Sequence, residues 1–524
     1  MTLLPALNGK DDRVFNTLLC VVYGLIGVVV GFQCDENDVH CFTSLDIKSA
    51  FTMIGKEKDI GQVYAKDRAL YSLNPERNGP VPIDDIITAD GWNHTRHLIT
   101  ANESMPGPSI IIYENKKITI LVKNHMINEA VTFHWHGIDQ LGWPAMDGVA
   151  FVSQCPILPG QTFNYTFKPR FGGSYWYHSH VGNQRDMGMY GAFIVLRKRD
   201  PVPFELQHIV QIQEWNHLYN AMDLLYANVK QEVKFPNSIL INGRGEFKDN
   251  LAPLEIFYVT KGIDDIQNSS ETKLHFLNFG FPKGDSSING RIFRWPTVSA
   301  LTQPSEVGTE CSGCTDEETC HCSHSINLKS GSEIIMVLLN LGTGAFISHP
   351  IHMHGHTFKV LKMEFPEVTI DGKFNFTEDI ECSSTLPNMN SSCNNSRWRN
   401  SSWNDYKNIP GININDPVRK DTIVVPYGGY VIIRIEAKNP GVWFMHCHID
   451  IHMVEGMALM LNESFEQSRL EIPNGLPTCH SYLTKMSGVV GSISTAQRSS
   501  SGISVKIKFP GRLFEKFATN IISI

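Results

Sequence analysis

Short runs in which apolar and polar residues alternate recur along the chain, with Gly, Pro and Asn between them. Side chains two residues apart project from the same face of a strand, so this alternation predicts half-buried β-strands. Stretches with the 3.6-residue period of an amphipathic helix are scarce. The pattern favours an all-β protein built from β-sandwiches.

The strand-like runs fall into three groups. The first covers about residues 85–200, and one of its runs is SIIIYENKKITILVKNH. The second begins at HIVQIQEW, continues through NSILINGRGEF and LEIFYVTKG, and ends at the polar stretch IDDIQNSSE. The third begins at TKLHFLNFGF and extends to about residue 484. Residues 34–84 show no clear pattern and we assign them no function, whereas the Ser-rich segment 485–524 is expected to be disordered or loosely attached.

Length and charge narrow the class of protein. A chain of 524 residues is too long for one core and predicts several domains. Charged residues make up 19% of the chain, and the net charge of -8 is not concentrated in long runs of one sign. We therefore expect no binding to nucleic acid.

One apolar run, VFNTLLCVVYGLIGVVVGF, follows Lys10 and Arg13 near the start of the chain. A basic segment before an apolar run is typical of a secretory signal peptide, so we expect residues 1–33 to be cleaved near Gly31 or Gln33. The run approaches the ~20 apolar residues of a spanning helix, and retention as a membrane anchor is the alternative. Asn-X-Ser/Thr sequons also favour a secreted, extracellular glycoprotein. They stand at Asn93, Asn102, Asn164, Asn268, Asn375, Asn390, Asn394, Asn400 and Asn462.

The twelve cysteines fit an oxidising compartment, where disulfide bonds persist. Cys20 lies in the export segment and Cys447 lies between two histidines, which leaves ten cysteines for five disulfide bonds. One group could instead bind zinc; its members are Cys311, Cys314, Cys320, Cys322, His321 and His324. We favour disulfide bonds there, because C-x-C spacing suits tetrahedral zinc poorly and the outside of a cell favours oxidised pairs.

Histidines separated by one residue are the most informative feature of the sequence. Both members of such a pair point to the same face of a strand and can bind one metal centre. A single pair would more simply be chance or a hydrogen-bonded core pair. Random placement of 21 His in 524 residues gives about one pair, and the chain has five. The pairs, which together indicate metal binding, are 134/136, 178/180, 352/354, 354/356 and 446/448.

The segment HCHIDIHMVEGM adds a thiol to this set. On an extended strand Cys447 points away from the side of His446 and His448, so one strand can serve two metal centres. Cys447 and His452, with Met457 as a long axial contact, supply most of a blue-copper site. The missing histidine is His349, in HPIHMHG. An ordinary buried thiol is the alternative for Cys447.

Four motifs, HWHG, HSH, HPIHMHG and HCHIDIHMVEGM, resemble in order and spacing those of the multicopper oxidases, specifically the animal laccase-like branch. The resemblance covers about residues 88–482. It implies tandem cupredoxin-like Greek-key β-sandwich domains and about four copper ions, one of type 1, one of type 2 and two of type 3.

The resemblance also implies how the ligands are shared. The type 1 ion would be held by His349, Cys447 and His452 with Met457 axial, and the type 2 ion by His134 and His352. The type 3 ions would be held by His136, His178 and His448, and by His180, His354 and His446. His356 has no ligand role in the family, and we take it as a supporting or structural residue.

Carboxylates near such a cluster matter, because reduction of dioxygen to water consumes protons that must reach a closed site. Asp147, in WPAMDG, matches a family aspartate and is the first candidate for a proton relay. A turn-forming Asp before Gly148 is the alternative. Asp450, in HCHID, is the second candidate, either as a relay or to orient a ligand histidine.

The resemblance implies three cupredoxin domains, of which the first and third are complete. The second is expected to be truncated, since its segment has some sixty residues against ~100 for a β-sandwich domain. A disulfide bond between Cys155 and Cys479 is also implied. The expected segments are 1–33 (signal peptide or anchor), 34–84 (N-terminal extension), 85–200 (domain 1), 201–262 (partial domain 2), 263–484 (domain 3) and 485–524 (Ser-rich tail).

The function that the resemblance implies is a laccase-type oxidase, which couples one-electron oxidation of phenols or aromatic amines to four-electron reduction of dioxygen to water. A ferroxidase-like metallo-oxidase acting on ferrous or cuprous ions is a second hypothesis. A copper-binding secreted protein with little activity, because domain 2 is incomplete, is a third. The expected partners are dioxygen and a small reducing substrate, and a membrane only if the N-terminal segment is retained.

Overall fold

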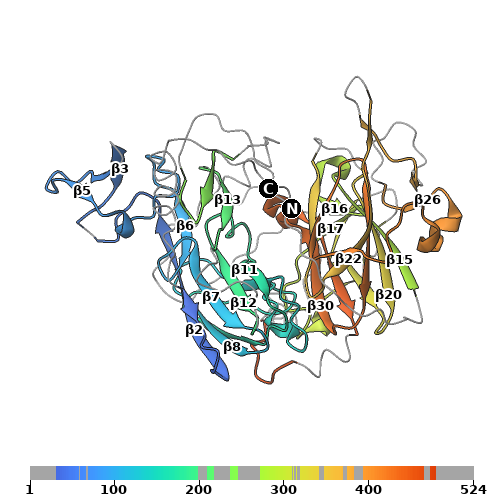
Figure 1. Cartoon of the computed structure of the whole chain (residues 1–524), viewed down its shortest axis with the longest axis horizontal. Coiled ribbons are helices and arrows are strands. Elements are labelled where there is room, and N and C mark those ends of the chain that lie inside the picture. Colours follow the sequence, from blue (N-terminus) through green and yellow to red (C-terminus); the bar gives the residue numbers. More distant parts are fainter. Residues whose placement is uncertain are drawn as a thin grey trace, which may run out of the picture. The chain divides into compact units, whose positions relative to one another are not determined.

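Two sheets of the N-terminal half face each other across an aromatic core (Figure 1). The ring of Trp135 lies 5.3 Å from that of Tyr165 and 5.2 Å from that of Phe167, which come from the opposite sheet. One sheet has the order β1-β7-β12-β11-β9 and the other β10-β8-β2-β6. The strands are β1 (Phe32–Gln33), β2 (His40–Phe51), β6 (His97–Ala101), β7 (Gly107–Tyr113), β8 (Lys117–Asn124), β9 (Phe133–His136), β10 (Thr162–Phe167), β11 (Gly173–Ser179) and β12 (Tyr190–Leu196).

The computed structural model describes only part of the chain. The described residues are 31–57, 59–66, 69–198, 209–217, 236–245, 272–309, 311, 314, 319–341, 347–369, 374–382, 393–464 and 472–479. The chain divides into a unit Met1–Cys479 and a unit His480–Ile524. Nearly all of the expected export segment and the whole Ser-rich tail lie outside the described residues. Within them, no helix is long and apolar enough to cross a membrane.

The first sandwich begins before residue 85, where we had expected it to start. Strand β2 lies between β8, which it pairs in parallel, and β6, which it pairs in antiparallel fashion. Its inward side chains Cys41, Leu45 and Ile47 are buried in the core. The segment 34–84 is therefore in part a component of this sandwich rather than an extension. Its remainder forms a small sheet of β3 (Val63–Lys66), β4 (Ala69–Ser72) and β5 (Pro80–Val81).

The middle segment contributes one described pair of strands, β13 (Ile212–Trp215) and β14 (Ser238–Ile241). Trp215 and Leu240 are buried in a core shared with Leu98 and Met105 of the first sandwich. The rest of residues 201–262 lies outside the described residues. The truncation of the second domain therefore stays a prediction.

The C-terminal half forms another pair of sheets, with the orders β18-β17-β16-β15-β20-β29-β22-β27 and β19-β31-β30-β21-β28. Apolar residues of both sheets share one core, and the short helix α3 (Asp450–Glu455) follows β30. The strands are β15 (Thr272–Gly280), β16 (Ser287–Ile288), β17 (Arg291–Phe293), β18 (Cys320–Cys322), β19 (Ser325–Leu328), β20 (Glu333–Leu339), β21 (His349–Met353), β22 (Phe358–Glu364), β27 (Val418–Lys420), β28 (Thr422–Val425), β29 (Tyr430–Glu436), β30 (Gly441–Cys447) and β31 (Ala458–Glu463).

Short elements complete the described chain. Two hairpins pair β23 (Glu367–Val368) with β24 (Phe374–Asn375) and β25 (Ile380–Cys382) with β26 (Ser396–Trp398). The 3-10 helices are η1 (Ile83–Asp85), η2 (Pro144–Met146), η4 (Pro282–Gly284), η5 (Pro304–Glu306), η6 (Ser401–Asn404) and η7 (Tyr406–Asn408). The fold is thus nearly all β, as expected, with sheets that form β-sandwiches.

Five disulfide bonds pair ten cysteines, and Cys447 is the free cysteine of the described residues. The bond between Cys155 and Cys479, with an S–S distance of 2.08 Å, confirms the expected pairing. The cluster considered for zinc forms two disulfide bonds instead, which removes the thiolates that zinc would need. The bonds are Cys34–Cys41, Cys155–Cys479, Cys311–Cys322, Cys314–Cys320 and Cys382–Cys393.

Candidate metal centres

Four histidine pairs converge because two strand pairs carry them in register. On β9 and β11, His134 lies directly opposite His178. On β21 and β30, His352 lies directly opposite His446. In each motif the second histidine stands two residues further along and therefore faces the same side. The first sandwich thus supplies four rings, and the C-terminal half of the chain, called the third segment from here on, supplies four more.

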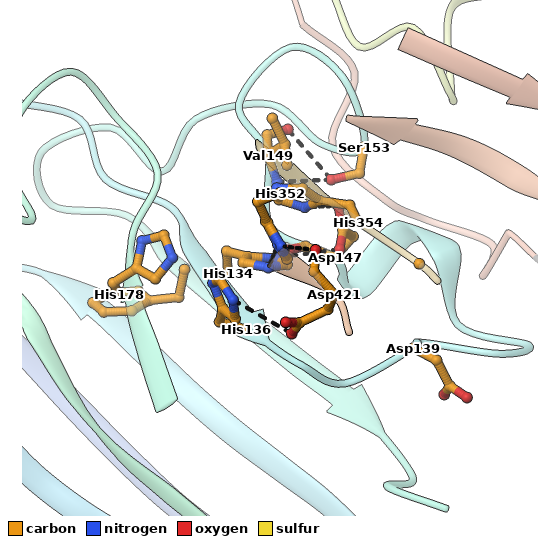
Figure 2. Close-up of polar contacts among 12 residues, drawn as sticks. His134, His136, Asp139, Asp147, Val149, Ser153, His178, His352, His354 and Asp421 are labelled. Atoms are coloured by element: carbon orange, nitrogen blue, oxygen red, sulfur yellow. Dashed lines mark hydrogen bonds and ion pairs between the residues drawn. The ribbon is translucent and has the colours of Figure 1, made fainter. Parts of the chain in front are cut away.

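Seven of the eight rings are buried and that of His448 is half-buried, and together they form one cluster. Figure 2 shows part of this cluster, with His134, His136, His178, His352 and His354 labelled. The Nε2 atoms of His134 and His352 are 3.3 Å apart, and those of His354 and His446 are 3.2 Å apart. Three sets of ligand atoms each lie within 4.8 Å of one another: His134 with His352 and His354, His134 with His136 and His178, and His180 with His354 and His446. His448 belongs to the same cluster, since its ring lies 5.0 Å from that of His136 and 5.4 Å from that of His178.

Backbone carbonyls fix the tautomer of several rings. A carbonyl oxygen only accepts, so the Nδ1 atom that faces it carries the proton and Nε2 keeps its lone pair for a metal ion. Four Nδ1 atoms lie 2.9 Å from such an oxygen: His134 faces Asp147, His352 faces Asp421, His178 faces Ser179 and His446 faces Cys447. Two unprotonated Nε2 atoms that meet at 3.3 Å, as in His134 and His352, are well suited to share a cation.

Burial keeps most of these histidines neutral, which is the form that binds a metal ion. It lowers the pKa of His446 to about 3 and the pKa values of His178, His180, His352, His354 and His448 well below the usual 6.5. Two of the buried ring nitrogens, Nε2 of His178 and Nε2 of His180, have no hydrogen-bond partner among the described residues. Orphaned neutral nitrogens in a converging set fit metal binding.

Asp147 lies inside the cluster, as expected for a relay candidate. Its side chain is fully buried, with Oδ1 3.3 Å from Nδ1 of His134 and Oδ2 3.0 Å from Nδ1 of His354. It follows helix η2, and Gly148 comes next with φ +85°. A Cβ at Gly148 would lie 1.6 Å from the carbonyl oxygen of Phe133, so the turn needs glycine. The turn role and the contact with the cluster therefore coexist.

Asp421 and Thr422 are site residues that the sequence analysis missed. Oδ2 of Asp421 lies 3.4 Å from Nε2 of His136, and its side chain is 27% exposed. Burial raises the pKa of this carboxyl group, but its contact with His136 outweighs that effect and the net pKa is lowered. Oγ1 of Thr422 lies 3.0 Å from Nδ1 of His352. Asp421 is thus partly open to solvent and touches the cluster, and Figure 2 shows its carboxylate beside His136.

The second centre brings together His349, Cys447 and His452. Sγ of Cys447 lies 3.6 Å from Nδ1 of His349 and 3.5 Å from Nδ1 of His452. Burial raises the pKa of Cys447 to about 12, and lowers the pKa of His349 to about 3 and that of His452 to about 4. Two neutral imidazoles and a thiol that ionises only beside a cation fit a copper site.

Met457 is held against this centre by backbone hydrogen bonds. Its N–H donates to the carbonyl of His452 at 2.8 Å, and its own carbonyl accepts from the N–H of Cys447 at 3.1 Å. The side chain is fully buried in the same core as Cys447. Met457 therefore lies where an axial contact would be expected, although its role as a ligand stays a prediction.

Asp450 and His356 lie beside the centres rather than in them. Asp450 begins α3, and its Oδ1 forms an ion pair with Nη2 of Arg185 at 2.5 Å. His356 lies 2.9 Å from the buried carboxylate of Glu463. That carboxylate also accepts from the N–H of Asn439 at 2.5 Å, so His356 belongs to a structural network. Its placement agrees with the supporting role expected for it.

Family models for multicopper oxidases match two segments of the chain. One matches residues 86–200 and the other residues 293–467. Together they cover more than half of the chain and contain all the histidines of the two centres.

Curated relatives extend the likeness over most of the chain. The iron transport multicopper oxidase FET3 of Saccharomyces cerevisiae is 23% identical over 522 residues, which cover 75% of this chain and 76% of that protein. Laccase-1 of Fomitopsis schrenkii is 25% identical over 520 residues, with 74% and 87% covered. The L-ascorbate oxidase of Cucurbita pepo var. melopepo is 24% identical over 537 residues, with 70% and 91% covered.

Solved structures share the fold. The structure of Fet3p, a multicopper oxidase that functions in iron import, matches with a TM-score of 0.57 and 19% identity, covering 86% of this chain and 95% of that chain. The structure of a mutant of the laccase from B. aclada matches with a TM-score of 0.55 and 19% identity, covering 84% and 92%. Taken with the family models and the two buried centres, these matches show that the chain belongs to the multicopper oxidase family, and that it is an oxidoreductase with oxygen as electron acceptor.

Proposed function

We propose that this chain is a laccase-type oxidase of the animal laccase-like branch, which oxidises phenols or aromatic amines one electron at a time and reduces dioxygen to water. The observation that carries the proposal is the position of Cys447. Its sulfur faces His349 and His452, while its chain neighbours His446 and His448 belong to the eight-histidine cluster. One strand therefore joins a site for electron entry to a site for dioxygen.

The ligand assignment belongs to the same proposal. The type 1 ion is assigned to His349, Cys447 and His452 with Met457 axial, and the type 2 ion to His134 and His352. The two type 3 ions are assigned to His136, His178 and His448, and to His180, His354 and His446. Copper bound in this way supplies one-electron redox chemistry and the binding of dioxygen, and the protein supplies position and selectivity.

Electron entry is assigned to the edge of His452. This side chain is 7% exposed, whereas His349 is 1% exposed, so a donor in solvent meets His452 first. The ring of Phe281 lies 4.9 Å from that of His452 and 5.4 Å from that of His349. An aromatic wall beside the entry residue favours an aromatic donor.

Proton supply is assigned to the carboxylates that touch the histidines. Asp421 reaches solvent and His136, so it can receive a proton at the surface. Asp147 is fully buried between His134 and His354, so it can hold a proton inside the cluster. Asp450 is the third candidate, and its carboxylate is paired with Arg185.

Metal ions are the second candidate donors. Glu455 lies on α3 three residues after His452, and accepts a hydrogen bond from Oγ of Ser286 at 2.6 Å. Burial and the neighbouring Asp285 raise the pKa of Glu455, which means that the two carboxyl groups repel each other. A carboxylate on the helix that carries the entry residue His452 is the feature that favours oxidation of ferrous or cuprous ions. A copper-binding protein with little turnover is the third candidate.

Secretion is proposed with the enzyme. Five disulfide bonds fit an oxidising compartment, and the sequons fit the same route. Retention through the N-terminal apolar run remains the alternative.

Oxygen uptake by copper-loaded protein tests the proposal. We expect a catechol or hydroquinone to give a higher specificity constant than ferrous iron, and Cys447→Ser to abolish both the blue colour and the uptake. Glu455→Gln should lower uptake with iron alone if metal ions are the substrate. A clear preference for iron would move the assignment to a metallo-oxidase. Fully loaded protein that consumes no oxygen with any donor would leave only copper binding.

A further inference from the structure

Arg185 is a charged residue of the first sandwich whose contacts reach the eight-histidine cluster and the turn that follows it. It stands five residues after His180, in the loop between β11 and β12. Its Nη2 donates to the carbonyl of His448 at 2.9 Å and forms an ion pair with Oδ1 of Asp450 at 2.5 Å. Its Nη1 lies against the imidazole of His448, in contact with Nδ1 and 3.3 Å from Nε2. One guanidinium therefore binds a backbone group, a ring and a carboxylate of the third segment.

The partners of Arg185 lie in the turn that connects the two metal centres. His448 belongs to the eight-histidine cluster and His452 to the thiol site, and Asp450 stands midway between them. Asp450 begins α3, yet no side chain caps that helix. Its carboxylate points to Arg185 instead. The turn that separates the two centres is thus bound by a residue 263 positions earlier in the chain.

We propose that Arg185 is a positioning residue: it clamps the His448–Asp450 turn to the loop that follows His178 and His180, and so fixes the spacing of the histidines from the two sandwiches. The proposal rests on the assignment of His448 as a copper ligand. Residues that hold a ligand in place contribute to metal affinity although they do not touch the ion.

Because the ion pair between Arg185 and Asp450 is buried, its stability depends on further hydrogen bonds. The side chain of Arg185 is 16% exposed and that of Asp450 is 5% exposed. A buried ion pair is favourable only when further hydrogen bonds satisfy both groups, and loss of one partner leaves an uncompensated charge. Arg185 has such a further bond in the carbonyl of His448, whereas Oδ2 of Asp450 has no hydrogen-bond partner among the described residues, so Asp450 depends on Arg185.

The loop that carries Arg185 is itself held. The carbonyl of Arg185 accepts from Nε2 of Gln213 at 3.4 Å, and the carbonyl of Asp186 accepts from Nη2 of Arg96 at 2.9 Å. The clamp therefore connects two fixed segments. Only the planar fork of arginine can bind the carbonyl, the ring and the carboxylate together, whereas lysine presents a single point of charge.

The test compares Arg185→Gln and Arg185→Lys with wild type, all loaded with copper. The readouts are copper per chain after dialysis against a chelator, the blue absorption, and kcat and KM for the donor and for dioxygen. The control is Arg397→Gln, which removes an exposed ion pair with Glu381.

In Arg185→Gln we expect copper at the eight-histidine cluster to bind roughly 10- to 100-fold more weakly. The blue colour and the KM for the donor should stay as in wild type, while kcat falls. Arg185→Lys should behave like Arg185→Gln, and Arg397→Gln like wild type. The clamp is refuted if Arg185→Gln retains copper and kcat, if lysine restores both in full, or if copper is lost equally from both centres. A wild-type protein that never turns blue would instead refute the copper assignment.

Discussion

Oδ2 of Asp147 lies 3.0 Å from Nδ1 of His354, although 207 residues separate them in the chain. The other oxygen of the same carboxylate lies 3.3 Å from Nδ1 of His134. A fully buried carboxylate thus joins a ring of the first sandwich to a ring of the third segment. The carboxylate accepts at Nδ1 of His354, and the backbone carbonyl of Asp147 accepts at Nδ1 of His134, so Nε2 of both rings is left free for copper.

Asp147→Asn should separate electron entry from dioxygen reduction. The amide nitrogen of asparagine cannot accept a hydrogen bond, and the side chain no longer takes up a proton. We expect kcat for dioxygen reduction to fall about 100-fold or more, the range for loss of a proton-transfer group. Reduction of the blue centre by hydroquinone without oxygen should keep its rate. Stopped-flow absorption measures both steps. Asp139→Asn is the control, since Asp139 lies away from the histidines (Figure 2) and pairs with Arg170 instead. Equal slowing of both steps would contradict a role limited to dioxygen reduction.

The Cys155–Cys479 bond should contribute strongly to stability, because it joins residues 324 positions apart. In the chain-entropy model a bond that closes so long a loop restricts the unfolded chain most. Replacing both cysteines with serine should lower the free energy of unfolding by about 2–5 kcal/mol. Denaturant unfolding measures the change. Replacing Cys314 and Cys320, only 6 positions apart, should cost less. An equal loss in the two variants would count against the entropic explanation.

The sequence predicted what depends on local spacing. His134 and His136 face one way because side chains alternate on any strand, and the same holds for His446 and His448 around Cys447. The two centres could therefore be predicted before the sheets were known. The partition of the histidines came from the resemblance, since spacing alone does not say which strands meet.

Contacts between distant segments could not be predicted. Asp421 stands in VRKDTIVV, a run without histidine or cysteine, and reaches His136 only when the third segment packs on the first sandwich. Arg185 meets Asp450 in the same way. Strand β2 was missed for another reason. Its inward side chains Cys41, Leu45 and Ile47 alternate irregularly with polar ones, so its place between β6 and β8 follows from pairing rather than from pattern.

His324 should make the protein less stable in acid. Burial, and secondarily the charge of Arg291, lowers its pKa from 6.5 to about 4. Between about pH 4 and pH 6.5, His324 therefore binds a proton in the unfolded chain but stays neutral in the folded chain. The contribution of neutral His324 to the free energy of unfolding is fully present above pH 6.5 and is lost as the pH falls toward 4.

The variant His324→Gln tests this effect. Between about pH 7 and about pH 4.5 wild type should lose roughly 2 kcal/mol more than His324→Gln, since one pKa unit corresponds to about 1.4 kcal/mol. Denaturant unfolding of copper-loaded protein at the two pH values measures the difference. His321→Gln serves as the control, because the side chain of His321 is exposed. An unchanged acid loss in His324→Gln would show that other groups cause it.

Glycan mapping should test secretion and the fold together. Asn164 lies on β10 with its side chain exposed, and Asn375 lies exposed on β24. Asn394 is 7% exposed, and its amide nitrogen lies 2.2 Å from where a Cβ at Gly290 would be. A glycan is bulky and needs a surface position.

In protein secreted from a eukaryotic host we expect glycans at Asn164 and Asn375 and none at Asn394, as measured by mass spectrometry after enzymatic release in heavy-oxygen water. Asn164→Gln should remove one glycan and leave oxygen uptake unchanged, whereas Asn394→Gln should leave the glycan count unchanged. Folded protein without any glycan would argue against the secretory route, and a glycan at Asn394 would contradict the packing of Asn394 against Gly290.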